Sequence, residues 1–345
     1  MTMQKLVITT IVIILMLTAS GARPKVKIKN LQHGQGSVVS VRFMRDGKGL
    51  LSASFDGSLV LWNLQTLMPV WKIDLDAETK NGESHTISEI LDMDVSPDDT
   101  TIALAYNRSH VVGNTLKGKS EYRIGLFDSR NGRELRTLIG HTALVGTVAF
   151  SPDGKLLASA SSDFTAKLWN IQTGEQVWSI KLRGLGKKIT FSPNGDLLAI
   201  GMLSNSPWQP VVEVRRVTQN ARLEREIEQG KRNVSDLAFS PDGKMLAIAT
   251  HDNDGSQVEL WNLHTAARKS TFIYKADISS IAFSPSRGLL GLGGLSGEII
   301  FRSLQTHSTT LVSKSDAQVN DICFSHDGSS LAAGTEKGGI VLIRR

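Results

Sequence analysis

Cysteine, proline and aromatic residues are scarce in this sequence. Its 345 residues include one cysteine, nine prolines and 6% aromatic residues. A single cysteine excludes a disulfide within the chain, so packing alone must hold the fold together. The sequence also lacks long charge runs, Gln/Asn tracts and Ser/Pro-rich stalks. Their absence excludes an extensively disordered chain.

Charge of one sign is not concentrated anywhere in the chain. The formal net charge is +6, and 40% of the residues are hydrophobic, as in an ordinary globular protein. A nucleic-acid-binding protein would gather its basic residues on one face beside stacking aromatics. We therefore expect no nucleic-acid partner. A weak attraction to anionic envelope polymers or lipid headgroups fits the scattered basic residues equally well.

The N-terminus has the layout of a secretory signal peptide. Lys5 precedes the 13-residue apolar run Leu6–Thr18, and the small residues Ala19–Ala22 follow it. This run is shorter than the ~20 residues that span a bilayer. We assign residues 1–22 to a cleaved signal and predict a secreted or periplasmic protein with no stable membrane span after cleavage. A membrane anchor of residues 6–21 is the alternative.

A short turn sequence recurs seven times, with 52, 55, 41, 48, 44 and 41 residues between successive copies. Its clearest copy is Phe150–Gly154, which reads Phe-Ser-Pro-Asp-Gly, and five of the nine prolines occupy this turn. Proline presets φ, aspartate bonds back to the backbone, and glycine takes the positive φ. The copies begin at Phe43, Val95, Phe150, Phe191, Phe239, Phe283 and Phe324.

One strand precedes each turn, and further strands follow it. In the third copy the following strands are Leu156–Ala160, Ala166–Trp169 and Gln176–Ile180. Four short strands in every 41–55 residues is the period of a β-propeller blade. The sequence therefore predicts an all-β, seven-bladed β-propeller with four-stranded antiparallel blades over residues 23–345.

The third repeat resembles the WD-repeat family. It opens with Gly140-His141, turns at Asp163 and ends its third strand with Trp169. The resemblance implies a hydrogen-bonded structural tetrad of His141, Asp163 and Trp169 with either Ser159 or Ser161, which share a strand face. In the first repeat it implies a tetrad of His33, Asp56 and Trp62 with either Ser52 or Ser54.

The resemblance covers residues 24–345 and is incomplete in several repeats. The second repeat has Phe127-Asp128 in place of the Trp dipeptide, and Trp-Asn replaces Trp-Asp in the first, third and fifth. Arg215, Arg302 and Ile343 replace the tryptophan in the fourth, sixth and seventh repeats, which excludes a tetrad there. Trp71 and Trp178 each follow the third-strand tryptophan by nine residues, so they are features of the repeat.

The seventh repeat supplies only three strands. Pro24–Lys29 precedes the first repeat and has no blade of its own. We expect this segment to form the outermost strand of the seventh blade and close the ring. Its alternating lysines, Lys25, Lys27 and Lys29, protect the sheet edge or form a basic binding stripe. Cys323 stands where other repeats carry Ala149 and Ala238, which predicts a small buried residue.

Local motifs for chemistry are weak or absent. Gly113–Ser120 matches the P-loop pattern, but a strand follows it where a true P-loop opens a helix, so we expect a basic loop. His251–Gly255 lacks the further ligands of a calcium loop, so we expect a turn. The sequence has no Gly-x-Ser-x-Gly and no His-Glu-x-x-His. We predict no catalytic residue, no metal and no cofactor.

Insertions crowd the face on which the tetrad His and Asp residues lie. The second blade has the largest, a predicted loop from about Asn107 to Glu121, and its entry loop is also long. The fourth blade inserts Trp208 between two prolines, and tryptophan is a common anchor of interfaces. The partner-binding candidates on this face are Trp208, Arg108, His110, Lys117, Lys119 and His85.

These observations predict a non-catalytic interaction scaffold, exported from the cytoplasm, that binds a protein or peptide on its loop-rich face. We expect a monomer or one member of a hetero-complex. Two alternatives stay open. One is a propeller enzyme, a hydrolase or lyase, with groups from several blades meeting at the central channel, and the other is a binding module for envelope glycans.

Overall fold

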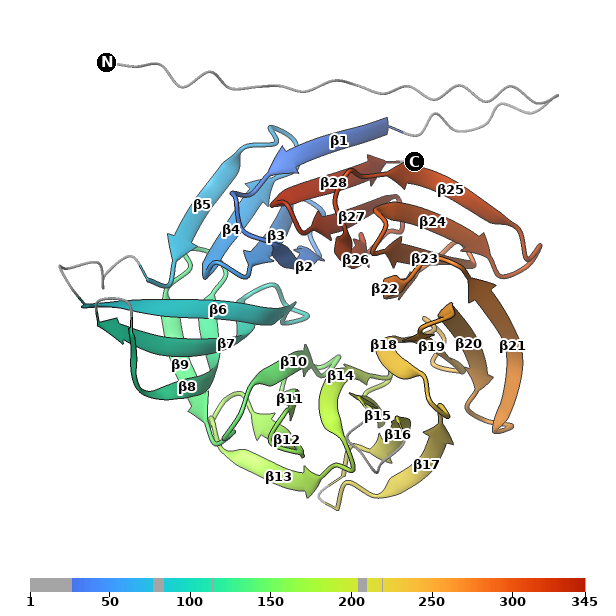
Figure 1. Ribbon diagram of the computed structural model, residues 1–345, viewed down its shortest axis with the longest axis horizontal. Helices are drawn as coiled ribbons and strands as arrows, with labels where there is room; N and C mark the ends of the chain where they lie inside the picture. Colours follow the sequence, from blue (N-terminus) through green and yellow to red (C-terminus); the bar gives the residue numbers. More distant parts are fainter. Residues whose placement is uncertain (1–26, 77–83, 113–114, 204–209, 219, 345) are drawn as a thin grey trace.

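Seven four-stranded antiparallel sheets stand radially around a central channel (Figure 1). The computed structural model describes residues 27–76, 84–112, 115–203, 210–218 and 220–344, which contain 28 strands and no helix. Within that part of the chain, nothing forms a helix long and apolar enough to cross a membrane. The predicted all-β, seven-bladed fold is confirmed.

Each blade begins with its innermost strand and ends with its outermost. Blades one to three consist of β2 (Val38–Phe43), β3 (Gly49–Ser54), β4 (Ser58–Asn63), β5 (Pro69–Asp74); β6 (Ser84–Val95), β7 (Thr101–Val112), β8 (Thr115–Asp128), β9 (Glu134–Ile139); and β10 (Val145–Phe150), β11 (Leu156–Ser161), β12 (Thr165–Asn170), β13 (Gln176–Lys181). Blades four and five consist of β14 (Leu185–Phe191), β15 (Leu197–Leu203), β16 (Val211–Arg216), β17 (Leu223–Glu228); and β18 (Asn233–Phe239), β19 (Met245–Asp252), β20 (Gly255–Asn262), β21 (Ala267–Tyr274). Blades six and seven consist of β22 (Ile278–Phe283), β23 (Leu289–Gly294), β24 (Glu298–Ser303), β25 (Thr309–Lys314); and β26 (Val319–Phe324), β27 (Ser330–Thr335), β28 (Gly339–Arg344), β1 (Lys27–Gln32).

An N-terminal strand closes the ring, as predicted, although it comprises Lys27–Gln32 where Pro24–Lys29 was expected. Lys25 lies outside the described residues. β1 pairs antiparallel with β28, from Lys27 opposite Arg344 to Gln32 opposite Gly339, and the two strands lie side by side in Figure 1. Lys27 and Lys29 are exposed on this outermost strand. The two ends of the described chain thereby share one sheet, so the last blade has its four strands.

The hydrophobic core consists of seven separate layers, one between each pair of adjacent blades. The layer between blades seven and one contains Leu31, Val38, Trp62 and Ile340, and six further clusters fill the other interfaces. Because a single blade can bury its faces only against two neighbours, each blade depends on the rest of the ring.

Small residues on the second strands let the blades approach one another. An added Cβ at Gly293 or Gly334 would lie 2.6 Å from a valine of the following blade, at Val319 and Val38 respectively. Such overlap would force the neighbouring valine to move. Alanine or glycine occupies the equivalent position in every blade: Ala53, Ala105, Ala160, Gly201, Ala249, Gly293 and Gly334.

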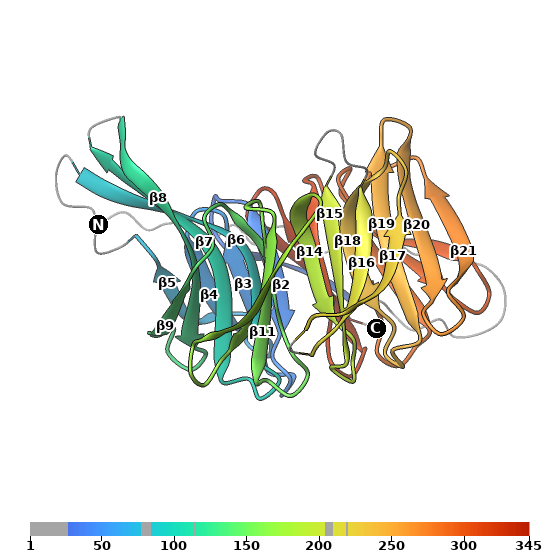
Figure 2. The same cartoon turned by 90° about the horizontal axis from the view of Figure 1, so that it is seen from below.

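The disc has two different faces. We call one the loop-rich face; it carries the segments that enter each blade and the turns between second and third strands, such as residues 55–57 and 162–164. The turn face, on the other side, carries the Ser-Pro-Asp-Gly turns, such as residues 240–243, and the turns between third and fourth strands. In Figure 2 the β7–β8 and β19–β20 hairpins mark the loop-rich face at the upper edge.

Leu31→Ala tests the contribution of the closing strand. Leu31 is 7% exposed, so we expect its truncation to leave a cavity and lower the free energy of unfolding by about 2–4 kcal/mol. Urea unfolding followed by tryptophan fluorescence measures the change. The matched control is Leu311→Ala on the exposed side of β25, for which about 0.5 kcal/mol or less is expected. Equal losses in both variants would contradict a closing role for β1.

Candidate functional site

In blade three, His141 links the segment that enters the blade to its second and third strands. Its Nδ1 is 2.8 Å from Asp163 Oδ2, and its Nε2 is 2.8 Å from Ser159 Oγ. Trp169 Nε1 donates to the same Ser159 hydroxyl at 2.9 Å. Of the two serines considered from the sequence, Ser159 makes these bonds, while Ser161 Oγ donates to the backbone carbonyl of Ala143.

The Asp163 carboxylate is held in its ionised form. Burial by itself raises the pKa of Asp163, but hydrogen bonds from His141, from Thr165 and from the Thr142 backbone outweigh it and lower that pKa well below its usual range. Donors that stabilise the charged form have this effect. The turn that carries Asp163 is therefore fixed to the segment entering the blade.

Blade one contains a longer version of the same network. Trp62 Nε1 donates to Ser52 Oγ at 2.8 Å, and Ser52 Oγ is 2.6 Å from His33 Nδ1. On the other side of the imidazole, His33 Nε2 is 2.7 Å from Ser58 Oγ, which donates to Asp56 Oδ1 at 2.5 Å. A second hydroxyl thus stands between this histidine and its carboxylate.

His33 is neutral in the folded protein. Burial lowers its pKa from 6.5 to about 4, against the smaller opposing effect of Asp56. The hydrogen bonds suit the neutral ring, because Ser52 accepts from Trp62 and can then donate its own proton to His33 Nδ1. A proton on Nδ1 would leave that hydroxyl without an acceptor, so His33 acts here as a structural linker.

Other blades replace the tetrad with different polar pairs. In blade five, Trp261 Nε1 donates to Glu259 Oε2 at 2.7 Å, and the other Glu259 oxygen accepts from Arg268 at 2.6 Å. In blade four, Arg215 stands at the tryptophan position and donates to Glu213 at 2.6 Å. Blades four and five thus stabilise the third strand with charged pairs in place of the tetrad.

The insertion of blade two is a β-ribbon, and the expectation of a loop from 107 to 121 was wrong. β6, β7 and β8 contain 12, 12 and 14 residues, where most strands of the ring have six. The ribbon rises above the loop-rich face in Figure 2. Part of the P-loop-like segment lies on β8, so no helix follows it to hold a phosphate.

Ribbon formation has a local cause. Between the paired strands, Ser109 and Ser120 share a hydroxyl–hydroxyl hydrogen bond of 2.8 Å. Asn107 Nδ2 donates to Glu89 Oε2 at 3.2 Å. These cross-strand polar pairs replace the apolar contacts that a sheet outside the disc cannot make. A polar insertion of this kind is predicted to be a loop when strands are identified only by the alternation of hydrophobic residues.

The ribbon brings together several of the residues predicted to bind a partner. His110 is paired across the sheet with Thr86 on one side and with Lys117 on the other, and His85 is paired with Val111. Arg108 is partly buried, whereas His110 is exposed. Lys119 lies on β8. Trp208 lies outside the described residues.

Apolar side chains on the same face escaped the sequence interpretation. Phe55, Leu144 and Phe164 are exposed large hydrophobics in blades one and three, on either side of the ribbon. Phe164 has φ of 62°, at the turn position where other blades have Gly57, Gly297 and Gly338 with φ between 73° and 87°. A left-handed conformation costs a non-glycine residue roughly 1–2 kcal/mol. In the sequence, the replacement of this turn glycine by phenylalanine was the signal that could have identified Phe164.

A cavity of about 290 Å3 lies at the central channel, where charged residues such as Arg42, Lys188 and Asp236 stand beside apolar ones. Each innermost strand has a β-bulge, and the residue after it faces the adjacent blade; these residues form a channel ring of Ser40, Asp92, Thr147, Lys188, Asp236, Ser280 and Asp321. Asp236 and Asp321 each accept a backbone N–H of the next blade, from Ile281 at 2.7 Å and from Val41 at 2.9 Å. The carboxylates therefore join neighbouring blades.

Two cations form ion pairs with the carboxylates of the channel. Arg42 contacts Asp321 at 2.6 Å and Asp94 at 3.3 Å, and Lys188 contacts Asp236 at 3.3 Å. Burial opposes the charge on Asp321, but Arg42 and Lys188 outweigh it and hold the pKa of that carboxyl below its usual range. These charged groups form ion pairs with one another, and this arrangement differs from that of a reactive acid–base pair.

Cys323 lines this channel and is half-buried, where the sequence predicted a small buried residue. Burial raises the pKa of its thiol, and nearby Arg42 lowers it less. A raised pKa leaves the thiol protonated and poorly nucleophilic. Among the described residues there is no group of three or more His, Cys, Asp or Glu side chains that could hold a metal ion.

Comparison with known proteins gives matches at both ends and in the middle of the chain. The model described as "WD domain, G-beta repeat" matches residues 25–63, 132–170 and 302–343. The model described as "Anaphase-promoting complex subunit 4 WD40 domain" matches residues 189–284. Between them the matches cover most of blades one, three, four, five and seven, together with one strand of blade two and two strands of blade six.

Similar proteins have varied names. An uncharacterized WD repeat-containing protein of Synechocystis sp. is 26% identical over 53% of this chain and 46% of its own length. A guanine nucleotide-binding protein subunit beta of Arabidopsis thaliana is 27% identical over 61% and 52%. Eukaryotic translation initiation factor 3 subunit I of Lodderomyces elongisporus is 28% identical over 40% and 41%. The chain thus spans about half the length of the curated relatives it matches.

The pH dependence of stability tests the neutral state of His33. Its pKa is about 4 in the folded protein and 6.5 when unfolded, so the stabilisation is complete above pH 6.5 and is lost as the pH falls toward 4. This pKa difference contributes on the order of 3 kcal/mol to the free energy of unfolding. We expect His33→Gln to reduce the difference in unfolding free energy between pH 7 and pH 4.5. The control is His264→Gln at an exposed turn; identical pH slopes in the parent and His33→Gln would refute the assignment.

Proposed function

We propose that this chain, which belongs to the WD-repeat β-propeller family, is a non-catalytic scaffold that binds a protein partner on its loop-rich face. The observation that carries this proposal is Phe164, an exposed phenyl group held at a left-handed turn position. Backbone strain at an exposed residue favours a functional role for that residue, because the strain does not help the blade to fold. Exposed aromatic side chains are frequent anchors of protein interfaces.

The surroundings of Phe164 suit a protein interface. Leu144 lies in the segment entering the same blade, and the backbone N–H of Ser162 donates to its carbonyl at 2.8 Å. The ribbon of blade two adds exposed Ile87 and His110. Apolar contacts at the centre with polar groups at the rim are the usual composition of an interface. The ribbon also extends the surface that one partner can touch.

The channel favours a scaffold over an enzyme. Asp92, Asp236 and Asp321 accept hydrogen bonds from the backbones of adjacent blades. A general acid or base must exchange protons with a substrate, whereas these carboxylates accept hydrogen bonds from the backbone of the ring itself. The same bonds make the disc rigid, and a rigid surface loses little entropy when it binds.

Phe164→Gly separates a binding role from a structural one. Glycine relieves the left-handed strain, so we expect the free energy of unfolding to stay unchanged or to rise by up to about 1 kcal/mol. We expect partner capture to fall at least tenfold in a crosslinking pull-down from the native host, quantified by mass spectrometry. Ile273→Ala, on the outer edge of blade five, is the control that keeps capture.

Two results would contradict the proposed face. One is a set of captured proteins shared by the parent and Phe164→Gly; the other is a clear loss of stability in Phe164→Gly, which would show that the phenyl group packs its own blade. A second bait carrying Trp208→Ala tests the tryptophan predicted from the sequence. If only that bait loses the partner, the anchor is Trp208 and the face remains correct.

We also propose that the chain is exported, on the basis of residues 1–22, which lie outside the described residues. The expected result is a protein in the periplasmic or culture fraction of its native host, with its N-terminus at Arg23 by intact-mass and N-terminal peptide analysis. Retention in the membrane fraction with Met1 present would instead favour the anchor of residues 6–21. A cytosolic protein with an intact N-terminus would refute both.

A further inference from the structure

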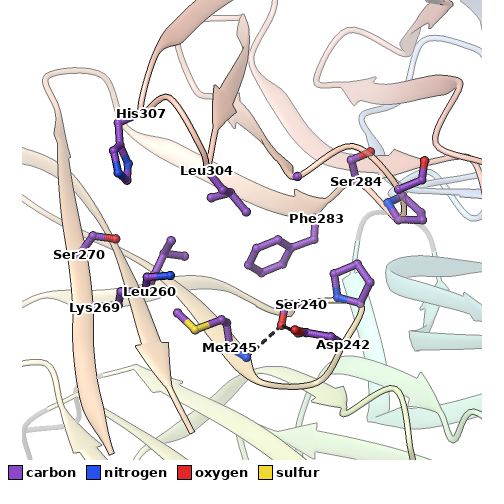
Figure 3. A pocket seen from close by; sticks show the side chains of 14 residues that line it. Ser240, Asp242, Met245, Leu260, Lys269, Ser270, Phe283, Ser284, Leu304 and His307 are labelled. Atoms are coloured by element: carbon purple, nitrogen blue, oxygen red, sulfur yellow. Dashed lines mark hydrogen bonds between the residues drawn. The ribbon is translucent and has the colours of Figure 1, made fainter. Parts of the chain in front are cut away.

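A groove opens on the turn face between blades five and six. It encloses about 360 Å3, within the range of roughly 300–1,000 Å3 that ligand sites occupy. Met245 and Leu260 of blade five and Phe283 and Leu304 of blade six line it. Figure 3 shows these apolar side chains around one space, with Ser270 and His307 on one side and Ser240 and Asp242 on another.

The equivalent groove is filled in other blades by the chain's own side chains. Trp71 is paired with Leu61 in blade one, and Trp178 with Leu168 in blade three. Trp71 reaches blade two, where its Nε1 donates to the Ser129 carbonyl at 3.1 Å. Trp178 is 7% exposed and packs in the core between blades three and four. An indole therefore fits this kind of groove.

Blade two fills its groove with an arginine. Arg136, paired with Leu126, reaches blade three and donates to the carbonyls of Thr173 and Gln172. Its guanidinium lies where a Cβ on Gly174 would clash. A long side chain that crosses from the outermost strand to the next blade is thus a recurring feature of this ring.

Ser270 is short by comparison with these side chains of blades one to three, as is Thr310, which is paired with Phe301 in blade six. Ser270 is paired with Leu260 in the same register that pairs the tryptophans with Leu61 and Leu168. Its hydroxymethyl group is too short to cross to blade six, so the space beside Leu304 stays open. Apolar surface left uncovered in this way favours a guest of the size of the missing side chain.

The polar groups around the opening give it a charge. Lys269 is exposed at the rim, and no carboxylate in the described part of the chain forms an ion pair with it. Asp242 is engaged in its own turn, where it accepts from Ser240 Oγ at 2.6 Å and from the Lys244 N–H at 3.1 Å. Asp242 keeps its negative charge on the other side of the opening. The side formed by β21 is therefore the positive one, and Lys269 there complements an acidic neighbour of the guest.

We propose that this groove binds the side chain of a tryptophan flanked by acidic residues in a segment of a partner protein. The indole takes the place that Trp71 and Trp178 occupy in blades one and three. The Leu304 carbonyl stands two residues after Arg302, as Ser129 stands two after Phe127, so it corresponds to the carbonyl that accepts the indole N–H of Trp71. This site lies on the turn face, separate from the loop-rich face.

Methyl NMR of the full chain with 13C-labelled methionine tests the site. The probes are the acetylated, amidated pentapeptides Gly-Asp-Trp-Asp-Gly, Gly-Asp-Ala-Asp-Gly and Gly-Lys-Trp-Lys-Gly. We expect the Asp-Trp-Asp peptide to shift the Met245 methyl signal upfield in a saturable way, while Met44, buried between blades one and two, stays unmoved. The alanine peptide should cause no shift, and the lysine peptide should bind at least fivefold more weakly.

Two further changes examine the contacts separately. Replacing the tryptophan with 1-methyltryptophan removes the indole N–H, and we expect about a two- to tenfold loss of affinity, the usual range for one hydrogen bond. Lys269→Glu should weaken the acidic peptide about two- to fivefold, as expected of an exposed ion pair. Arg225→Glu, on the outermost strand of blade four at the register of Ser270, is the charge-matched control that leaves peptide binding unchanged.

Ser270→Trp closes the groove from within. The introduced indole should shift the Met245 methyl upfield without any peptide, abolish the response to the peptide and leave the melting temperature unchanged or higher. Ser270→Thr is the matched variant that keeps the groove and the response. The proposal is overturned if the alanine peptide binds as well as the tryptophan peptide, if Met245 does not respond, or if Ser270→Trp still binds. Phe164 lies on the opposite face, so a negative result for the groove leaves the proposed scaffold function unaffected. A negative result for Phe164 likewise leaves the groove proposal unaffected.

Discussion

Pairing of β1 with β28 is the interaction on which the rest of the structure depends. Each apolar layer lies between two blades, so a blade with one missing neighbour exposes a whole layer to water. The pairing unites the N-terminal strand with the last blade and completes the seventh layer. Stability is thereby distributed around the ring, and no disulfide is needed to hold its ends together.

The channel shows a second constraint, because the innermost strands converge where backbone groups have little access to water. A β-bulge in every innermost strand exposes N–H groups, and aspartates of the preceding blade accept them in three of the seven interfaces. Buried carboxylates need compensating charge. Arg42 and Lys188 provide it. The charged interior is thus a consequence of joining the blades, and it stiffens the surface on which partners bind.

Departures from the repeat mark the proposed binding sites on both faces. Where the blades agree, as in the small residues of the second strands, the residue answers a packing need common to all seven. Phe164 replaces a glycine at a turn and adds an exposed ring, whereas Ser270 replaces a large side chain and leaves a groove. Both changes go against the stability of their own blade. A partner that covers the ring or fills the groove would account for each.

Repeats made the fold predictable from the sequence, since seven copies of one turn specify seven blades with the same strand order. The tetrad residues His141, Asp163 and Trp169 were identifiable because the resemblance assigns each a place in the blade. The ribbon of blade two was not, because Ser109 and Ser120 stabilise it by pairing across strands and leave no apolar alternation. Trp208 lies beyond what the structure describes.

The sequence by itself determined the architecture of this protein: strand period, turn chemistry and the closing strand follow from residues that act locally or repeat. Only the tertiary structure decided which serine bonds each histidine, how the channel charges pair, and where Phe164 and Ser270 face. The reason is physical. The serine contacts depend on the strand register within one blade, between residues 18 or 19 apart. The ion pairs and grooves between blades depend on the separation of strands about 40 or more residues apart, and no local pattern encodes those distances.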